Sequence, residues 1–241
     1  MVALFRILFF LPIVVVVCLI GILICVVRPF HRNNTYTVSK LLSSMAPLFG
    51  IKLLVRVPQD LTNTPKVIIG NHQNNFDLVT ISGGVTPGVV SIGKKSLKWV
   101  PIFGQLYWLS GNILIDRKNK SRAAGTINQT ADKMDKKNLS IWMFPEGTRS
   151  RGRGLLPFKT GAFHTAIQAQ VPIIPIVLSS TGHFSLNRWN NGYAIVEHLP
   201  EIDTSSIDKS GIRDLAEQAR QAMSDKIEQL DAEVAQLNAK K

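Results

Sequence analysis

The sequence has only two cysteines in 241 residues, and both, Cys18 and Cys25, lie in one apolar segment near the N-terminus. They offer neither a disulfide framework nor a C-x-x-C metal motif, so the remainder of the chain is compatible with a reducing compartment. The sequence also lacks a G-x-S-x-G nucleophile motif, a G-x-x-x-x-G-K-[ST] phosphate loop, a G-x-G-x-x-G motif and a His/Cys cluster at metal-ligand spacing. We therefore expect no covalent intermediate on a serine, no metal and no cofactor.

Acidic residues are scarce, with 16 against 28 basic residues and a net charge of +12. From residue 201 onward there are nine acidic and six basic residues, so the first 200 residues carry seven acidic and 22 basic ones. A body this basic indicates an anionic partner, which is nucleic acid, a phospholipid surface or a phosphorylated small molecule. Charge alone does not choose among these three.

Residues 7–27 form an uncharged apolar run, long enough to cross a hydrocarbon core of about 30 Å. The run ends in bulky valines, without the small residues of a signal-peptide cleavage site, and this favours a membrane segment that is kept. Three basic residues follow it, Arg28, Arg32 and Lys40, whereas Arg6 alone precedes it. The positive-inside rule therefore places the rest of the chain in the cytoplasm.

Two arrangements of this N-terminal region stay open. In the first, the run is a bilayer span, although Pro12 and Gly21 are able to interrupt it. Alternatively, it pairs with the amphipathic stretch at residues 38–55 to form a helical hairpin that lies in one leaflet. The apolar residues of that stretch are Leu41, Leu42, Met45, Leu48 and Phe49.

The middle of the chain alternates short apolar runs with polar, helix-compatible stretches. A helix is predicted between residues 117 and 139, where Ala123, Ile127, Ala131 and Met134 recur at helical spacing. This alternation is typical of an α/β domain with a mostly parallel sheet flanked by helices. The predicted strands are residues 66–70, 88–93, 112–116, 139–144, 172–178 and 193–199.

Apolar residues recur every three or four positions from Ile212 to Leu237, which predicts a C-terminal amphipathic helix. The helix packs its apolar face either on the domain or, as a coiled coil, on a partner. We divide the chain into membrane-anchoring helices at 1–57, an α/β domain at 58–208 and the C-terminal helix, packed on that domain, at 209–241.

The stretch NHQNNFD places His72 and Asp77 five residues apart at the end of a predicted strand. On a continuous helix these side chains point about 140° apart, so they meet only if the amides between them form a turn. The carboxylate then fixes the tautomer of the imidazole and leaves its other nitrogen basic. On spacing alone, a solvated loop histidine beside a helix-capping aspartate is an equal alternative.

Two further strands end in polar loops at what should be the same edge of the sheet. FPEGTRSRGRG contains Arg149, Arg151 and Arg153, and arginine binds two phosphate oxygens at once. A basic loop that faces anionic lipid is the alternative. GNILIDR ends in Asp116 and Arg117, which are also compatible with a plain surface ion pair.

Four stretches in order, NHQNNFD, GNILIDR, FPEGTRS and VPIIPIV, together resemble the glycerolipid acyltransferases with an H-x4-D motif. The resemblance implies transfer of a fatty acyl group from a thioester to the 2-hydroxyl of lysophosphatidic acid, which gives phosphatidic acid. It implies His72 as general base and Asp77 as the residue that orients it. It further implies that the glycerol phosphate is held by Arg117, Glu146, Gly147, Thr148 and Arg149.

The resemblance also sets the expected partners and location. The co-substrate is acyl-CoA or acyl carrier protein loaded with an acyl chain, the surroundings are membrane phospholipids, and the site lies on the cytoplasmic face of the bacterial inner membrane. Glycerol 3-phosphate or another lysolipid is the alternative acceptor. A basic, membrane-anchored binding module is a further alternative, but nucleic acid is not expected, since the runs RKNKSR and RSRGR lack interleaved aromatic residues.

Overall fold

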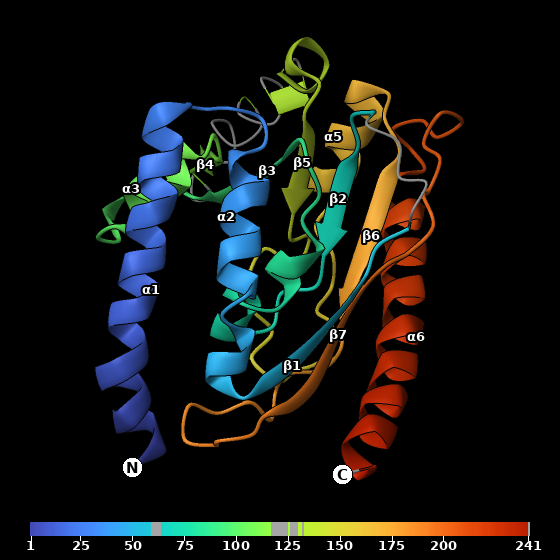
Figure 1. Ribbon diagram of the computed structural model, residues 1–241. Helices are drawn as coiled ribbons and strands as arrows, with labels where there is room; N and C mark the ends of the chain where they lie inside the picture. The colour runs from blue at the N-terminus through green and yellow to red at the C-terminus, as the bar shows by residue number, and fades with distance from the viewer. Residues whose placement is uncertain (59–63, 117–124, 126–129, 132, 241) are drawn as a thin grey trace.

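The computed structural model describes residues 1–58, 64–116, 125, 130–131 and 133–240. This part of the chain forms a seven-stranded sheet in the order β1-β7-β6-β2-β5-β3-β4 (Figure 1). Neighbouring strands run parallel, except for the antiparallel pair β6 and β7. The predicted α/β class with a mostly parallel sheet is therefore confirmed. The strands are β1 Ile51–Arg56, β2 Val67–Gly70, β3 Val89–Lys94, β4 Ile113–Ile115, β5 Ser140–Met143, β6 Ile173–Leu178 and β7 Gly192–His198.

Helices cover both faces of the sheet, because successive side chains of each strand point to opposite sides. Val67 and Ile69 of β2 join the core beneath α5 (Gly161–Ala169) and α6 (Ile212–Ala239). Ile68, between them, joins the opposite core, beneath the other helices. Figure 1 shows these layers, with the N-terminal helices on one side of the sheet and α6 on the other. The other helices are α1 Val2–Val27, α2 Asn34–Ser43 and α3 Phe103–Leu109.

All six predicted strands are present, but β1 was missed. Sequence analysis assigned residues 38–55 to an amphipathic helix, and this is wrong from Ile51 onward. A short 3₁₀ turn, Ala46–Phe49, ends at Gly50, whose φ of 68° is in the left-handed region that favours glycine. The chain then enters β1, which pairs with β7. The sheet thus begins within residues 1–57.

The C-terminal helix α6 begins at the predicted residue and packs on the domain. Its buried face includes Leu215, Met223 and Leu230, which join the core on that side of the sheet. Polar contacts add to the packing, since the Asp231 carboxylate accepts hydrogen bonds from the N–H and hydroxyl of Ser180. The apolar face of α6 is therefore buried against the domain, and a coiled coil with a partner is not needed to explain it.

The helix predicted at residues 117–139 lies largely outside the described residues. Those described between 125 and 137 are helical, and Ala131 and Met134 are buried. Arg117 lies outside the described residues, as do the predicted helix positions 123 and 127.

Helix α1 is long and apolar enough to cross a membrane by length and composition, and it is continuous through Pro12 and Gly21. One face packs along the domain. A Cβ on Gly21 would meet Leu106 of α3 and Val38 of α2, and the thiol of Cys25 lies 3.6 Å from the Ser110 hydroxyl. The remaining apolar side chains of α1 are mostly exposed.

Candidate active site

His72 and Asp77 meet across a tight turn at the carboxyl end of β2. His72 Nδ1 lies 2.5 Å from Asp77 Oδ2, and the two side chains are 19% and 6% exposed. The turn forms because Asn74 caps a 3₁₀ turn, Asn75–Leu78, by accepting a hydrogen bond from the Phe76 N–H. Asp77 Oδ2 also accepts the Gln73 N–H at 2.8 Å. The carboxylate is thus fixed by backbone donors while it holds the imidazole.

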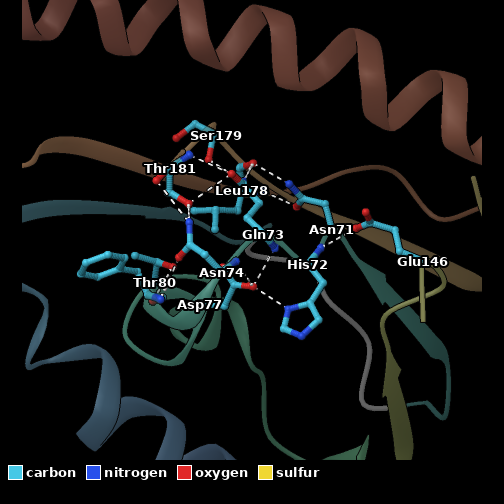
Figure 2. Close-up of polar contacts among 11 residues, drawn as sticks. Asn71, His72, Gln73, Asn74, Asp77, Thr80, Glu146, Leu178, Ser179 and Thr181 are labelled. Atoms are coloured by element: carbon cyan, nitrogen blue, oxygen red, sulfur yellow. Dashed lines mark hydrogen bonds and ion pairs between the residues drawn. The ribbon is translucent and has the colours of Figure 1, made fainter. Parts of the chain in front are cut away.

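Amide side chains tie this turn to the end of β6, as Figure 2 shows. Asn71 exchanges two hydrogen bonds of 2.8 Å with the backbone of Leu178. Gln73 donates to the Leu178 and Ser179 carbonyls and accepts from the Thr181 N–H. The amides therefore place the turn, and they leave the imidazole free to face the cavity.

Glu146 supports the turn from the other side. Its Oε1 accepts the His72 N–H at 2.6 Å (Figure 2). Its Oε2 accepts the Leu156 N–H at 3.0 Å. The side chain is buried, and this burial raises the pKa of the carboxyl group, although the hydrogen bonds from His72 and Leu156 oppose the rise. Both oxygens are occupied by backbone donors of the protein.

The loop that contains Glu146 packs directly on the turn between His72 and Asp77. The N–H groups of Ser150 and Arg151 donate to the carbonyls of His72 and Gln73 at 2.8 and 2.9 Å. The Phe144 ring stacks on the imidazole, with ring centroids 4.2 Å apart and an interplanar angle of 17°. Two sequence motifs more than 70 residues apart thus form one rigid unit.

A cavity of about 540 Å³ adjoins this unit. One part of its wall is polar and includes His72, Asp77 and Arg149. The side chain of Arg149 lines the cavity, and its buried Nε–H bonds to no described residue. Another part of the wall is apolar. Its residues include Val38, Leu42, Ile81, Val85, Ile92, Leu97, Phe103, Leu106, Trp142 and Phe144.

The other predicted binding residues lie in different positions. Gly147 and Thr148 line the cavity beside Arg149, whereas Glu146 does not. Gly147 has a φ of 70°, and a Cβ there would lie 2.7 Å from Lys159 Nζ, so glycine lets the loop turn toward the cavity. Sequence analysis did not single out Lys94, which also lines the cavity. Lys94 lies at the carboxyl end of β3, and the same kind of position, at the end of a predicted strand, identified the other candidate residues from the sequence.

Among the residues that the structure describes, no group of three or more His, Cys, Asp or Glu side chains is arranged to hold a metal ion. The site therefore consists of a histidine, a carboxylate that holds it, cationic side chains and an apolar cavity. A histidine so oriented acts as a general base toward a hydroxyl group. Arginine is suited to hold a phosphate on the same substrate.

Comparisons with known proteins agree with this chemistry. The chain is 52% identical over 227 residues, 93% of either chain, to the 1-acyl-sn-glycerol-3-phosphate acyltransferase of Escherichia coli K12. It is 50% identical over 240 residues to the enzyme of the same name from Haemophilus influenzae, covering 99% of this chain and 100% of that one. The human 1-acyl-sn-glycerol-3-phosphate acyltransferase alpha is 33% identical over 223 residues, 91% of this chain and 79% of that one.

The fold also matches a solved structure. The crystal structure of the 1-acyl-sn-glycerophosphate acyltransferase of Thermotoga maritima superposes with a TM-score of 0.72, covering 96% of this chain and 95% of that one at 20% identity. At that sequence identity, the match shows a shared fold and nothing more. The model of the acyltransferase family matches residues 52–179, which include the His72 turn, the Glu146 loop and most of the residues that line the cavity between them. The chain belongs to the acyltransferase family.

Proposed function

We propose that this protein transfers a fatty acyl group from a thioester to the 2-hydroxyl of 1-acyl-sn-glycerol 3-phosphate and so forms phosphatidic acid. The observation that carries the proposal is the contact of His72 with Asp77 beside a cavity that combines an apolar wall with an unpartnered arginine donor. An acceptor with one acyl chain and one phosphate matches this cavity, because the acyl chain fits the apolar part of the wall and the phosphate fits the part with the arginine. The bacterial relatives at 50–52% identity bear the name of this activity.

In the proposed mechanism, His72 is the general base. Asp77 Oδ2 accepts a hydrogen bond from the Nδ1–H of His72, so that Nε2 has a free lone pair to accept the proton of the acceptor hydroxyl. The hydroxyl oxygen attacks the thioester carbonyl carbon, and the resulting tetrahedral oxyanion collapses with cleavage of the C–S bond. The proton then passes from Nε2 to the leaving thiolate. Such a base contributes about 10² to 10⁴ in rate.

We assign the acceptor phosphate to Arg149, with Gly147 and Thr148 beside it and Arg117 assisting. The free Nε–H of Arg149 supports this assignment. The family resemblance gave Glu146 the same role, but its two oxygens are already bonded to backbone donors and its negative charge repels a phosphate. We propose that Glu146 holds the His72 turn in place and does not bind substrate.

We propose that α1 attaches the enzyme to the bacterial inner membrane, with the site on the cytoplasmic face, as the charges around α1 favour. α1 contacts the domain near both of its ends, through Arg6 and through Cys25. A helix held in this way cannot place its ends on opposite sides of a bilayer while the domain stays on one side. Of the two arrangements left open by the sequence, we therefore favour α1 lying in one leaflet.

The test is an acyl-transfer assay on lysophosphatidic acid with acyl-CoA and with acyl carrier protein as donors, because the basic body suits either anionic carrier. Glycerol 3-phosphate serves as the competing acceptor. His72→Ala should lower turnover by about 10² or more while the protein still binds lysophosphatidic acid. Full turnover by this variant, or a preference for glycerol 3-phosphate, would contradict the proposal.

A further inference from the structure

A loop at residues 185–190 is held against the N-terminal end of α1 by a buried charge. Arg6, which is 3% exposed, donates from its guanidinium to the backbone oxygens of Ser185, Leu186 and Trp189 at 3.3, 3.0 and 3.1 Å. Carbonyl dipoles thus serve as its partners in place of a carboxylate. Loop and helix end are therefore joined into one unit.

This unit presents apolar side chains outward. The Phe5 ring lies 5.3 Å from the Trp189 ring and 4.6 Å from the Phe9 ring, centroid to centroid. We call Phe5, Phe9, Leu186 and Trp189 the loop patch. Its members are 39%, 58%, 40% and 60% exposed. A contiguous exposed apolar patch marks an interaction surface, and tryptophan is enriched where such surfaces meet the lipid–water interface.

Cationic residues lie beside the loop patch. Residues 180–192 contain the exposed Arg188 and no acidic residue. An open groove of about 830 Å³ adjoins the patch, and its wall includes Lys40, Lys52 and Trp189. Lys40 donates one hydrogen bond to the Gly83 carbonyl. The Lys52 ammonium lies over the Tyr193 ring, 5.2 Å from its centroid, on the α6 side of the sheet, so Lys40 and the exposed Arg188 are the cations on the side of the patch. Such cations strengthen binding to an anionic leaflet.

We propose that the 185–190 loop is a second membrane-binding element, in which Leu186 and Trp189 enter the leaflet beside α1. Lys40 and Arg188 then contact the headgroups of anionic phospholipids beside the patch. The apolar surface that the patch shares with α1, and the lack of acidic residues in the 180–192 segment and in the groove wall, identify the occupant as lipid. This inference rests on the proposed attachment of α1 to the membrane.

The second contact has a mechanical consequence. A single helix that lies in a leaflet leaves the attached domain free to rotate about the helix axis. A loop patch on the same side of the domain removes that freedom, because both α1 and the loop must then face the lipid. The domain therefore meets the bilayer in one orientation, which fixes the height of the cavity above the membrane.

The experiment places an environment-sensitive NBD fluorophore at three positions of the full chain, in a background with Cys18→Ala and Cys25→Ala. The labelled variants are Leu186→Cys in the loop, Leu23→Cys on the exposed side of α1 and Glu228→Cys on α6, which lies across the sheet. Vesicles of phosphatidylglycerol and phosphatidylethanolamine are added, and emission and quenching by doxyl-labelled lipid are recorded. A blue shift with quenching at 186 and 23, but not at 228, is the expected result.

The other outcomes separate the two proposals. A response at 23 without one at 186 overturns the role of the loop and leaves the attachment of α1 standing. No response at either position contradicts both. A response at 228 as strong as that at 186 also overturns the inference, since it shows that the label, and not the loop, enters the lipid.

A second measurement avoids labels. The double variant Leu186→Ala, Trp189→Ala should lower the partition of the protein into these vesicles by about tenfold or more, with its acyl-transfer rate in detergent unchanged. Leu54→Ala, which shortens an exposed leucine on β1, is the matched control and should leave the partition unchanged. Lys40→Gln with Arg188→Gln should weaken binding to anionic vesicles and not to zwitterionic ones. Equal partition of all variants would overturn the inference.

Discussion

The contact between His72 and Asp77 depends on side chains to which we assign no part in the chemistry. Asn71 and Gln73 fix the backbone on either side of His72, and Glu146 accepts the His72 N–H itself. Spacing in the sequence favoured a turn between His72 and Asp77 but left a solvated histidine as an equal alternative. In the structure, the side-chain amides of Asn71 and Gln73 hold the turn that brings His72 and Asp77 together. Their hydrogen-bond partners lie more than 100 residues away, at the end of β6, so no local sequence pattern predicts these contacts.

Glu146→Gln tests the proposed positioning role. The amide offers one acceptor oxygen and turns a donor toward either the His72 or the Leu156 N–H, so one hydrogen bond to the turn is lost. We expect kcat to fall by about 10- to 100-fold, or about 1.4–2.7 kcal/mol in the barrier. The KM for lysophosphatidic acid should stay within about twofold, because no contact to substrate is removed.

Steady-state kinetics across acceptor concentrations, with a thermal melt to check folding, separates this role from a binding role. If Glu146 instead held the glycerol phosphate, KM would rise while kcat changed little. Arg149→Gln provides the comparison, since we assign that side chain to the phosphate and expect its loss to raise KM.

At the scale of elements, the sequence predicted what local patterns encode. The apolar runs of β2, β5 and β6 are bounded by glycine, proline or polar residues and needed no tertiary information. β1 was missed because its apolar residues continue those of the preceding helical stretch. Its identity as a strand depends on pairing with β7, about 140 residues along the chain. A single glycine separates the two elements.

Gly50→Ala tests whether this glycine is needed to separate the 3₁₀ turn from β1. The substitution places a Cβ on a residue with a φ of 68° and about 1.9 Å from the Trp189 carbonyl oxygen, so both the backbone and the neighbouring loop must move. Gly152→Ala is the control, since its φ is 83° but nothing lies within 4 Å of the added Cβ. The control should cost about 1 kcal/mol of unfolding free energy, and Gly50→Ala clearly more, about 3 kcal/mol. Denaturant unfolding in detergent measures both, and equal losses would show that the contact has no role.

Leu230→Ala tests the packing of α6 on the sheet. Leu230 is 1% exposed, and its truncation should lower the unfolding free energy by about 2–5 kcal/mol through lost burial and a residual cavity. Gln229→Ala, on the exposed side of the same turn, should change it by less than about 0.5 kcal/mol. Similar values for the two variants in denaturant unfolding would mean that α6 does not depend on this face.

At the scale of the whole molecule, charge is divided between two ends of the chain. The basic excess lies in the first 200 residues, whereas the last 41 residues are net acidic. Those acidic residues lie mostly on α6, on the other side of the sheet from α1 (Figure 1). Composition predicted an anionic partner but not which face would meet it. The three-dimensional arrangement places α1 and the basic residues Arg28, Arg32 and Lys40 on the side of the sheet opposite α6, and we expect that side to meet the anionic partner.

Salt should therefore separate the electrostatic and apolar parts of membrane binding. Raising NaCl from about 0.1 M to about 1 M shortens the Debye length from about 10 Å to about 3 Å and screens the lysines and arginines beside α1. Partition into phosphatidylglycerol vesicles should fall severalfold, but not to zero, because the apolar face of α1 still enters the lipid. Partition into phosphatidylcholine vesicles should be lower at the start and change little. Flotation assays at both salt concentrations measure the partition, with circular dichroism to verify the fold. If binding to anionic vesicles does not change with salt concentration, the basic face does not contact the headgroups.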